Sequence, residues 1–224
     1  MSVLKSASLS AGWALAAALV AVPLGANAQQ NTNWQGPYVG LNVGGMWSQP
    51  SAAIGLNGTG GGFGGSGAGF MGGVQTGYNW MIGPMVIGPE VDFNGSTLSS
   101  YVSGGAGASQ ISATQKMPWF TTWRVRAGYP VGSVMPYVTG GAVWGHQSLE
   151  GNDSANGGYF NVSNNFWTYA VGAGIEGHLS SQWTAKLEYL YIGTPDTSLS
   201  SPATTSITER SIGNLIRVGL NYQF

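Results

Sequence analysis

The sequence predicts an all-β protein, an eight-stranded antiparallel up-and-down transmembrane β-barrel, and three observations lead to this prediction. Eight segments alternate with period two between apolar and polar residues, the charges inside them lie on the polar face, and the chain begins with an export signal. Period two is the repeat of a β-strand. Because no other apolar run approaches the ~20 residues that a spanning helix needs, insertion in a membrane would have to use strands closed into a barrel.

Residues 1–28 have the pattern of a secretory signal peptide. Lys5 precedes an apolar run over residues 9–22, and Ala26-Asn27-Ala28 forms a small-x-small cleavage site. An uncleaved membrane anchor is the alternative, but the apolar run is shorter than the ~20 residues of a spanning helix. We therefore expect residues 29–224 to form the mature protein, a single outer-membrane β-barrel domain.

The composition excludes several classes of protein. Charged residues make up 7% of the chain, against a usual ~25%, and a soluble protein so poor in charge would stay dispersed with difficulty. Without Lys5, six basic and eight acidic residues remain, so the net charge is −2 (6 − 8) and there is no nucleic-acid footprint. Cysteine is absent, which excludes disulfides. The 38 glycines, 9 tryptophans and 10 tyrosines are typical of tight β geometry with aromatic residues at membrane interfaces.

The expected strands follow one another through the mature chain, each near the ~9–11 residues that a tilted strand needs to cross a bilayer. Their ranges are residues 36–47, 70–80, 85–94, 116–129, 136–145, 166–179, 183–192 and 211–224. Short turns (81–84, 130–135, 180–182) alternate with long loops (48–69, 95–115, 146–165, 193–210). Because bacterial barrels have short periplasmic turns and long external loops, we expect both ends of the mature chain in the periplasm. The glycine-rich residues 58–67 predict a flexible tract in the first loop.

The last strand alternates most clearly. One face carries Ile212, Ile216, Val218, Leu220, Tyr222 and Phe224, and the other carries Ser211, Gly213, Arg217, Gly219, Asn221 and Gln223. Asn214 is the only polar residue on the first face, and Leu215 is the only large apolar residue on the second. A transmembrane strand would place Tyr222 and Phe224 in the aromatic girdle at the membrane interface.

Nine titratable side chains lie on the strand face opposite the aromatic and branched residues, and we assign them to the lumen. They are Glu90, Asp92, Arg124, Arg126, Glu176, His178, Lys186, Glu188 and Arg217, with Lys116 on the same side at the rim. A charge that faces lipid at mid-membrane costs roughly 2–4 kcal/mol. Because four acids balance four bases, and buried charges need partners, we interpret the set as a network that holds the barrel closed. The alternative is an ion pathway, for which inward glycines leave space: Gly40, Gly44, Gly73, Gly77, Gly172 and Gly174.

A catalytic site has one weak candidate. His146 begins the third long loop close to Ser148, Glu150 and Asp153, from which a serine–histidine–acid set could be assembled. Nothing in the spacing holds a nucleophile beside a base, so we expect no enzyme and no catalytic residues. Two histidines without cysteine disfavour a transition-metal site, and the two loop acids are a weak signal for a divalent cation. We expect neither a metal nor a cofactor.

The aromatic residues mostly lie toward the strand ends. They include Trp47, Trp80, Trp119, Trp123, Trp144, Trp167, Trp183, Tyr189, Tyr191 and Tyr222. Side chains of this kind lie at the level of the lipid headgroups. A carbohydrate-binding platform would use the same residues but cluster them in one loop, whereas here they recur strand by strand, so we interpret them as interfacial girdles.

Several segments resemble one known family. They are Trp34-Gln-Gly-Pro-Tyr-Val-Gly-Leu-Asn-Val-Gly-Gly45, Thr168-Tyr-Ala-Val-Gly-Ala-Gly-Ile-Glu176, Trp183-Thr-Ala-Lys-Leu-Glu-Tyr-Leu-Tyr191 and Asn214-Leu-Ile-Arg-Val-Gly-Leu-Asn-Tyr-Gln-Phe224. Together they are similar to the small outer-membrane immunogenic, porin-like proteins of Gram-negative bacteria, relatives of the OmpA and OmpX barrels. The resemblance covers essentially the whole mature chain. It implies an eight-stranded outer-membrane barrel, often classed as a porin and exposed as an antigen, with no agreed catalytic site.

The resemblance also implies that Tyr222 and Phe224 end the chain as an assembly signal for the barrel-assembly machinery. The chain departs from the family in its long glycine-rich loop and in prolines that border or interrupt strands, which are Pro84, Pro89, Pro118 and Pro130. Since proline has no N–H for the sheet, we expect bulges or local loss of pairing in the strands over 85–94 and 116–129.

These observations favour a structural, surface-exposed role in the cell outer membrane, with at most narrow conductance. A general diffusion porin for small hydrophilic solutes is one alternative. An adhesin or lipopolysaccharide-binding protein that acts through its external loops is another. We expect a monomer whose partners are outer-membrane lipid, lipopolysaccharide and the assembly machinery, and no nucleic acid. Fold alone does not decide among these roles.

Overall fold

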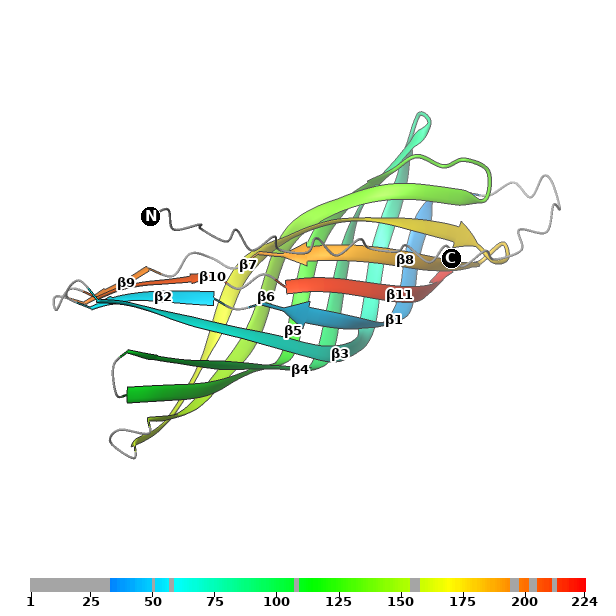
Figure 1. Ribbon diagram of the computed structural model, residues 1–224. Coiled ribbons are helices and arrows are strands. Elements are labelled where there is room, and N and C mark those ends of the chain that lie inside the picture. Colours follow the sequence, from blue (N-terminus) through cyan, green and yellow to red (C-terminus); the bar gives the residue numbers. More distant parts are fainter. Residues whose placement is uncertain are drawn as a thin grey trace, which may run out of the picture. The chain divides into compact units, whose positions relative to one another are not determined.

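Eight strands form a closed antiparallel ring in the computed structural model (Figure 1). They are β1 (Gly36–Ser48), β3 (Thr59–Ile82), β4 (Met85–Ala106), β5 (Ser109–Gly128), β6 (Val134–Asp153), β7 (Gly158–His178), β8 (Trp183–Ile192) and β11 (Gly213–Gln223). The structure describes residues 33–49, 51–56, 59–106, 109–153, 158–193, 198–201, 205–210 and 213–224. The expected signal peptide, residues 1–28, lies outside these ranges. No helix in the described ranges is long and apolar enough to cross a membrane.

The ring has up-and-down order, which confirms the predicted fold class. Each barrel strand pairs with the barrel strands before and after it in the chain, and the first and last strands pair with each other. In that closing pair Gly40 lies opposite Asn221 and Gly44 opposite Arg217. The backbone N–H of Phe224 extends the pair by donating to the carbonyl oxygen of Pro37 at 3.1 Å. A closed ring leaves no unpaired sheet edge, which is the condition for strands to span a membrane.

The period-two pattern gives each strand two faces with different surroundings. In β11 the side chains of Leu215, Arg217 and Asn221 are buried inside the ring, whereas Val218 and Leu220 are exposed on its outside. The outward face of the barrel is therefore apolar, and the lumen contains the charged residues together with apolar side chains such as Leu215.

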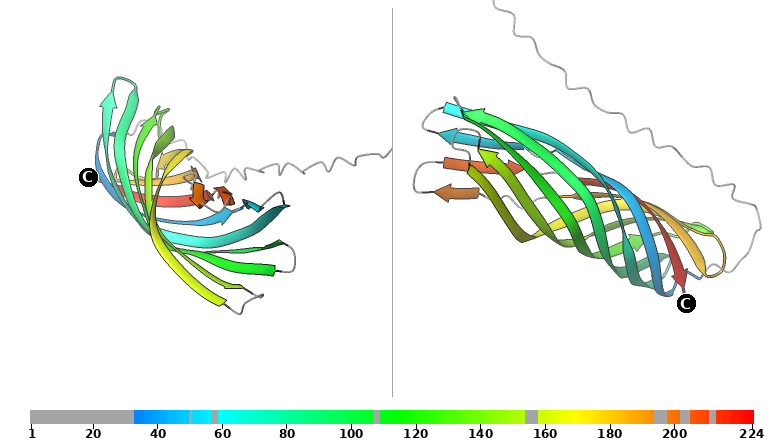
Figure 2. Two further views of the ribbon diagram at one scale, coloured as in Figure 1. Left: turned by 90° about the vertical axis from the view of Figure 1, so that its left-hand side faces the viewer. Right: turned by 90° about the horizontal axis from the view of Figure 1, so that it is seen from below.

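The strands are longer than predicted on the side of the long connections. β3, β4, β5, β6 and β7 have 24, 22, 20, 20 and 21 residues, and three short strands extend the sheet there: β2 (Ser51–Leu56), β9 (Ser198–Ser201) and β10 (Thr205–Arg210). β2 pairs with β3 and β10, and β10 pairs with β9 (Figure 2). The four long connections that were predicted as loops are therefore largely strand in the residues that the structure describes. Outside the lipid an extended strand needs no apolar face, so its glycine, serine and threonine residues show no period-two contrast.

The glycine-rich tract is the clearest example of this difference. Its residues from Thr59 onward belong to β3, where they pair with β2 and then with β4, and Gly58 lies outside the described residues. The expectation of a flexible tract is therefore corrected for the part that the structure describes. The paired backbone explains this strand structure, because the hydrogen bonds of the sheet hold the glycines even though glycine has no side chain to pack.

Tight turns join β3 to β4, β5 to β6 and β7 to β8, and we call this side of the barrel the short-turn end and the opposite side the long-loop end. Gly83 and Gly132 lie in two of these turns with φ of +60° and +64°, in the left-handed region that glycine adopts without strain. Pro84 and Pro130 flank strands, as expected. Pro89 lies inside β4, and the register with β5 continues through it. On the other side of the strand, the pairing with β3 stops at Glu90 and resumes at Ile87 in the same register, so the expected local loss of pairing is found there.

A bulge does occur in β5 at Pro118. The register of β5 with both neighbouring strands shifts around this residue. Beyond the shift Gln115 and Met117 line the lumen, and Lys116 between them is 49% exposed, with its Nζ 3.1 Å from the carboxylate of Glu150. Placing Lys116 on the lumen side was therefore wrong, because the bulge reverses which residues of the strand face inward.

Candidate functional site: the barrel lumen

Eight charged side chains meet in the middle of the lumen, and we call them the charged layer. They are Glu90 and Asp92 from β4, Arg124 and Arg126 from β5, Glu176 from β7, Lys186 and Glu188 from β8, and Arg217 from β11. All eight are buried. Nine ion pairs join them into one connected cluster. The structure thus brings together every predicted lumen residue except His178.

Glu90 is the centre of the charged layer. Its carboxylate forms ion pairs with all four bases, Arg124, Arg126, Lys186 and Arg217. The Nζ of Lys186 lies 2.8 Å from Oε2 of Glu90. Removing one member of a buried ion pair is far more costly than removing one at a surface, because its partners are left without compensation.

Asp92 and Glu188 form ion pairs with two of the bases that also contact Glu90, Arg124 and Arg217. Arg217 lies 2.6 Å from Glu188 and 3.0 Å from Asp92. Arg124 lies 3.0 Å from Glu188 and 2.9 Å from Asp92. A guanidinium can donate several hydrogen bonds in one plane, which allows each arginine to contact two or three carboxylates at once.

Neutral polar side chains complete the network; the sequence placed Asn221 on the polar face of the last strand but did not assign the others to the lumen. Tyr38 donates to Glu90 at 2.7 Å and Tyr137 donates to Glu188 at 2.9 Å. Asn221 donates to Glu176 at 2.8 Å and also accepts a hydrogen bond from Gln75. With these residues, all eight barrel strands contribute side chains to the hydrogen-bonded network. In the period-two pattern these residues lie on the inward face of their strands, as the charged residues do, and this position was the signal that could have identified them.

The space beside the inward glycines is occupied by atoms of neighbouring strands. A Cβ at Gly44 would lie 2.7 Å from the Cβ of Arg217, and one at Gly174 would lie 2.6 Å from the hydroxyl of Tyr137. A Cβ at Gly40 would overlap the side chain of Asn221. Backbone and side-chain atoms of neighbouring strands therefore leave little room beside these glycines.

An apolar layer lies next to the charged layer, on the side of the long-loop end. Each of the eight barrel strands contributes to it: Met46, Met71, Leu98, Phe120, Val143, Ala170, Leu190, Ile192 and Leu215. Four of them, Phe120, Ala170, Leu190 and Leu215, have no exposed surface. Leu215, the one large apolar residue on the otherwise polar face of the last strand, belongs to this layer. A packed apolar layer offers no hydrogen-bond partners to water or ions at this level of the lumen.

His178 lies apart from the charged layer, which corrects its assignment to the network. Its ring packs edge-on against Trp34, with 4.2 Å between centroids, and its Nδ1 lies 3.2 Å from the carbonyl oxygen of Ser180. Trp34, Val86 and Met135 form a small buried cluster. His178 is the last residue of β7, so its inward parity places it at the rim of the short-turn end, beyond the reach of the carboxylates.

The weak catalytic candidates do not assemble. Nδ1 of His146 lies 2.8 Å from the amide oxygen of Asn165, and its ring stacks on Trp119. The carboxylate of Glu150 pairs with Lys116. The side chain of Asp153 lies outside the described residues. In the part of the chain that is described, no three acidic or histidine side chains come together in a way that could hold a metal ion.

Four tryptophans on three adjacent strands form one aromatic cluster on the outside of the barrel. Ring centroids are 5.1 Å apart for Trp119 and Trp144, 5.4 Å for Trp123 and Trp167, and 6.1 Å for Trp144 and Trp167. Phe93 joins the cluster through Trp119. The aromatic residues recur strand by strand, as expected. The pairing of β5, β6 and β7 also brings these four tryptophans together in one sector of the outer surface instead of spacing them around the barrel.

Comparison with known proteins agrees with this architecture. The family model described as "outer membrane protein beta-barrel domain" matches residues 14–224. The chain belongs to this outer-membrane β-barrel family. The protein therefore resides in the cell outer membrane.

Individual relatives support the assignment to the outer-membrane β-barrel family. The chain is 33% identical over 204 residues to the 31 kDa outer-membrane immunogenic protein of Brucella melitensis, covering 86% of this chain and 84% of the relative. It is 34% identical over 125 residues to the 22 kDa outer membrane protein of Rhizobium leguminosarum, covering 55% and 52%. The crystal structure of the outer membrane protease OmpT from Escherichia coli matches with a TM-score of 0.52 at 8% identity, covering 88% and 99%. The last match reflects the fold alone.

Proposed function

We propose that this outer-membrane barrel has a structural, surface-exposed role and conducts little or nothing through its lumen. The observation that supports this most directly is the apolar layer, to which every barrel strand contributes a buried side chain. Transfer of a hydrated ion through such a layer would remove its water without replacing it, at a high cost in free energy.

The charged layer supports the same proposal. A diffusion porin needs an open, water-filled lumen, and a selective pore needs an excess of one sign of charge. Here four acids and four bases are ion-paired with one another. The space beside the nearby glycines is taken up by atoms of neighbouring strands. Eight-stranded barrels are of the size whose interior side chains fill the lumen.

The proposal includes the display of the long-loop end at the cell surface. The name of the Brucella melitensis relative, an immunogenic protein, favours an antigen-like role. We further propose a monomer without catalytic activity, in contact with outer-membrane lipid and lipopolysaccharide. Tyr222 and Phe224 at the end of β11 would present the assembly signal, and Phe224 is exposed on the outside of the barrel.

Ion flux through reconstituted protein tests the proposal. Folded protein is incorporated in liposomes loaded with K⁺, and its amount is measured from the heat-modifiable band on gels. We expect K⁺ release no faster than from protein-free liposomes, and no stable current steps in planar bilayers. A conducting porin reconstituted at the same density serves as the positive control.

Two results would contradict the proposal. Stable current steps from the wild-type protein would show that the lumen conducts. Swelling of the liposomes in small sugars would favour the diffusion porin instead. Because insertion is measured independently, a silent membrane cannot be mistaken for protein that failed to insert.

A further inference from the structure

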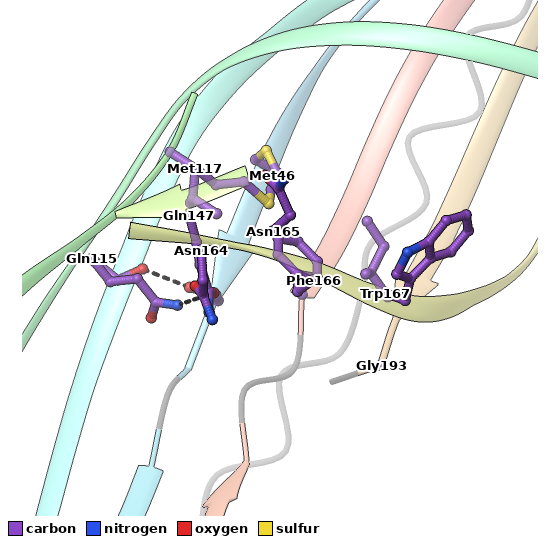
Figure 3. Close-up of a pocket in the computed structure, with 14 residues that line it drawn as sticks. Met46, Gln115, Met117, Gln147, Asn164, Asn165, Phe166, Trp167 and Gly193 are labelled. Atoms are coloured by element: carbon purple, nitrogen blue, oxygen red, sulfur yellow. Dashed lines mark hydrogen bonds between the residues drawn. The ribbon is translucent and has the colours of Figure 1, made fainter. Parts of the chain in front are cut away.

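A cavity opens above the apolar layer at the long-loop end, and nothing in the proposed structural role uses it (Figure 3). Its volume is about 300 Å³, at the lower end of the range for small-molecule sites. Side chains of β1, β4, β5, β6 and β7 line it, together with the ends of β8 and β11. The cavity is therefore part of the barrel wall and lumen rather than of one loop.

The floor of the cavity is apolar. Met46, Leu98 and Ile192 belong both to the cavity lining and to the apolar layer. Met117 and Phe166 add to this surface, and Met117 packs against the layer. Because the layer is continuous across the eight strands, the cavity ends there and does not lead into the charged layer. It suits a bound molecule with an apolar portion rather than a solute in transit.

In the described residues, the upper lining is polar but carries no formal charge. Gln115 donates to the amide oxygen of Gln147 at 2.9 Å, and Asn164 lies beside this pair (Figure 3). The hydroxyls of Ser48 and Ser100 form a second pair at 2.8 Å. Amides and hydroxyls both donate and accept hydrogen bonds, so they can hold a hydroxyl or carbonyl group. A charged group would lose water here without gaining an ionic partner.

The cavity also reaches the outer face of the barrel. Trp167 lines it, yet this side chain is 58% exposed and belongs to the outward aromatic cluster. Gly193, directly after the end of β8, lies on the same side of the cavity. A molecule with an apolar chain could therefore approach from the level of the lipid interface, where amphiphiles concentrate.

We propose that this cavity binds an uncharged amphiphile, with its apolar chain against Met46, Leu98 and Met117 and its hydroxyl or carbonyl group at the amide rim. The site goes beyond the proposed structural role and does not depend on it. Binding at a closed site requires no conductance, so the flux experiment and the experiment below can fail independently.

The methionines allow a direct test with 1-octanol as the probe. Met46 and Met117 line the cavity, Met135 is buried near the short-turn end, and Met81 and Met85 are 40% and 42% exposed beside the turn that joins β3 to β4. In folded protein carrying ¹³C-methyl methionine, we expect saturable NMR shifts at the two cavity methionines and none at Met135. Shifts at the exposed pair report non-specific partitioning and are expected to grow linearly.

A matched pair of variants tests the location. Asn164 lines the cavity, and the adjacent Ser163 is exposed on the same strand without lining it. Asn164→Trp is expected to fill the mouth and weaken binding of 1-octanol at least tenfold, whereas Ser163→Trp leaves it within about twofold. Equal affinity in the two variants would overturn the proposal.

The charge of the probe gives a second arm that uses only the wild-type protein. Octanoate and octylammonium are expected to bind at least tenfold more weakly than 1-octanol, because no charged side chain lines the cavity among the residues that the structure describes. Comparable binding of either ion would contradict the uncharged class. Shifts at Met46 and Met117 that remain linear and parallel those of Met81 would show partitioning alone and would also overturn the proposal.

Discussion

The charged layer and the apolar layer are made by the same strands, yet they depend on the fold in different ways. Glu188 in the charged layer and Leu190 in the apolar layer are two residues apart on β8, and Arg217 and Leu215 are equally close on β11. In the charged layer each residue needs particular partners, as Glu90 does with its four bases. In the apolar layer any neighbour that fills the space is adequate.

This difference separates two tasks inside one lumen. A one-residue slip between strands would separate acids from bases and leave buried charges unpaired, which is costly. The charged layer therefore favours one register around the ring. The apolar layer contributes packed apolar side chains, and it also forms the floor of the cavity beneath the long-loop end. Three substitutions, each with a matched control, test this division.

Glu90→Gln should have the largest effect on stability. The amide keeps the volume but leaves four buried bases facing three acids, so we expect the free energy of unfolding to fall by about 3–5 kcal/mol. Urea unfolding of protein folded in lipid vesicles measures it. The control is Glu150→Gln in the exposed pair with Lys116, for which we expect about 0–1 kcal/mol. Equal losses in the two variants would refute the special role of the charged layer.

Leu215→Ala tests the apolar layer. This side chain has no exposed surface, and its truncation leaves a cavity in the lumen, so we expect a loss of roughly 2–5 kcal/mol. Leu220→Ala on the outside of the same strand, where the leucine is 42% exposed, should cost less because lipid chains fill the space. The same unfolding measurement compares them. A larger loss for Leu220→Ala would reverse our assignment of the two faces.

Gly44→Ala and Gly45→Ala give the smallest and sharpest comparison. A Cβ at Gly44 would lie 2.7 Å from the Cβ of Arg217, whereas one at Gly45 meets nothing within 4 Å. We expect Gly44→Ala to destabilise by about 1–3 kcal/mol through overpacking. Gly45→Ala should be neutral or stabilise by roughly 0.5–1 kcal/mol, because alanine loses less backbone entropy than glycine in a strand. If unfolding and the heat-modifiable band were unchanged in both variants, the lumen at Gly44 would be open.

Sequence reasoning predicted the barrel class and the membrane-spanning parts of its strands well. In these parts lipid on one side and a polar lumen on the other require strict alternation, and residues such as Leu220 and Asn221 show it directly. At the long-loop end both faces of a strand meet similar surroundings. The alternation is lost there, so β2, β9 and the extension of β3 could not be recognised.

The same reasoning placed residues on faces but could not place them along the barrel axis. His178 has the inward parity of Glu176, yet it lies at the rim against Trp34. Lys116 has the parity of Arg124, yet the bulge at Pro118 turns it outward. Parity is a local property, whereas depth in the lumen and the position of a bulge depend on the neighbouring strands.

The sequence by itself determined which side of the wall most strand residues face, because a period of two follows from backbone geometry alone. Only the tertiary structure decided which side chains meet. Glu90 became the centre of the charged layer, and Gly40 came to face Asn221, through the register of strands far apart in the chain. Those contacts exist only when the ring closes, since closure sets the stagger of all eight strands together.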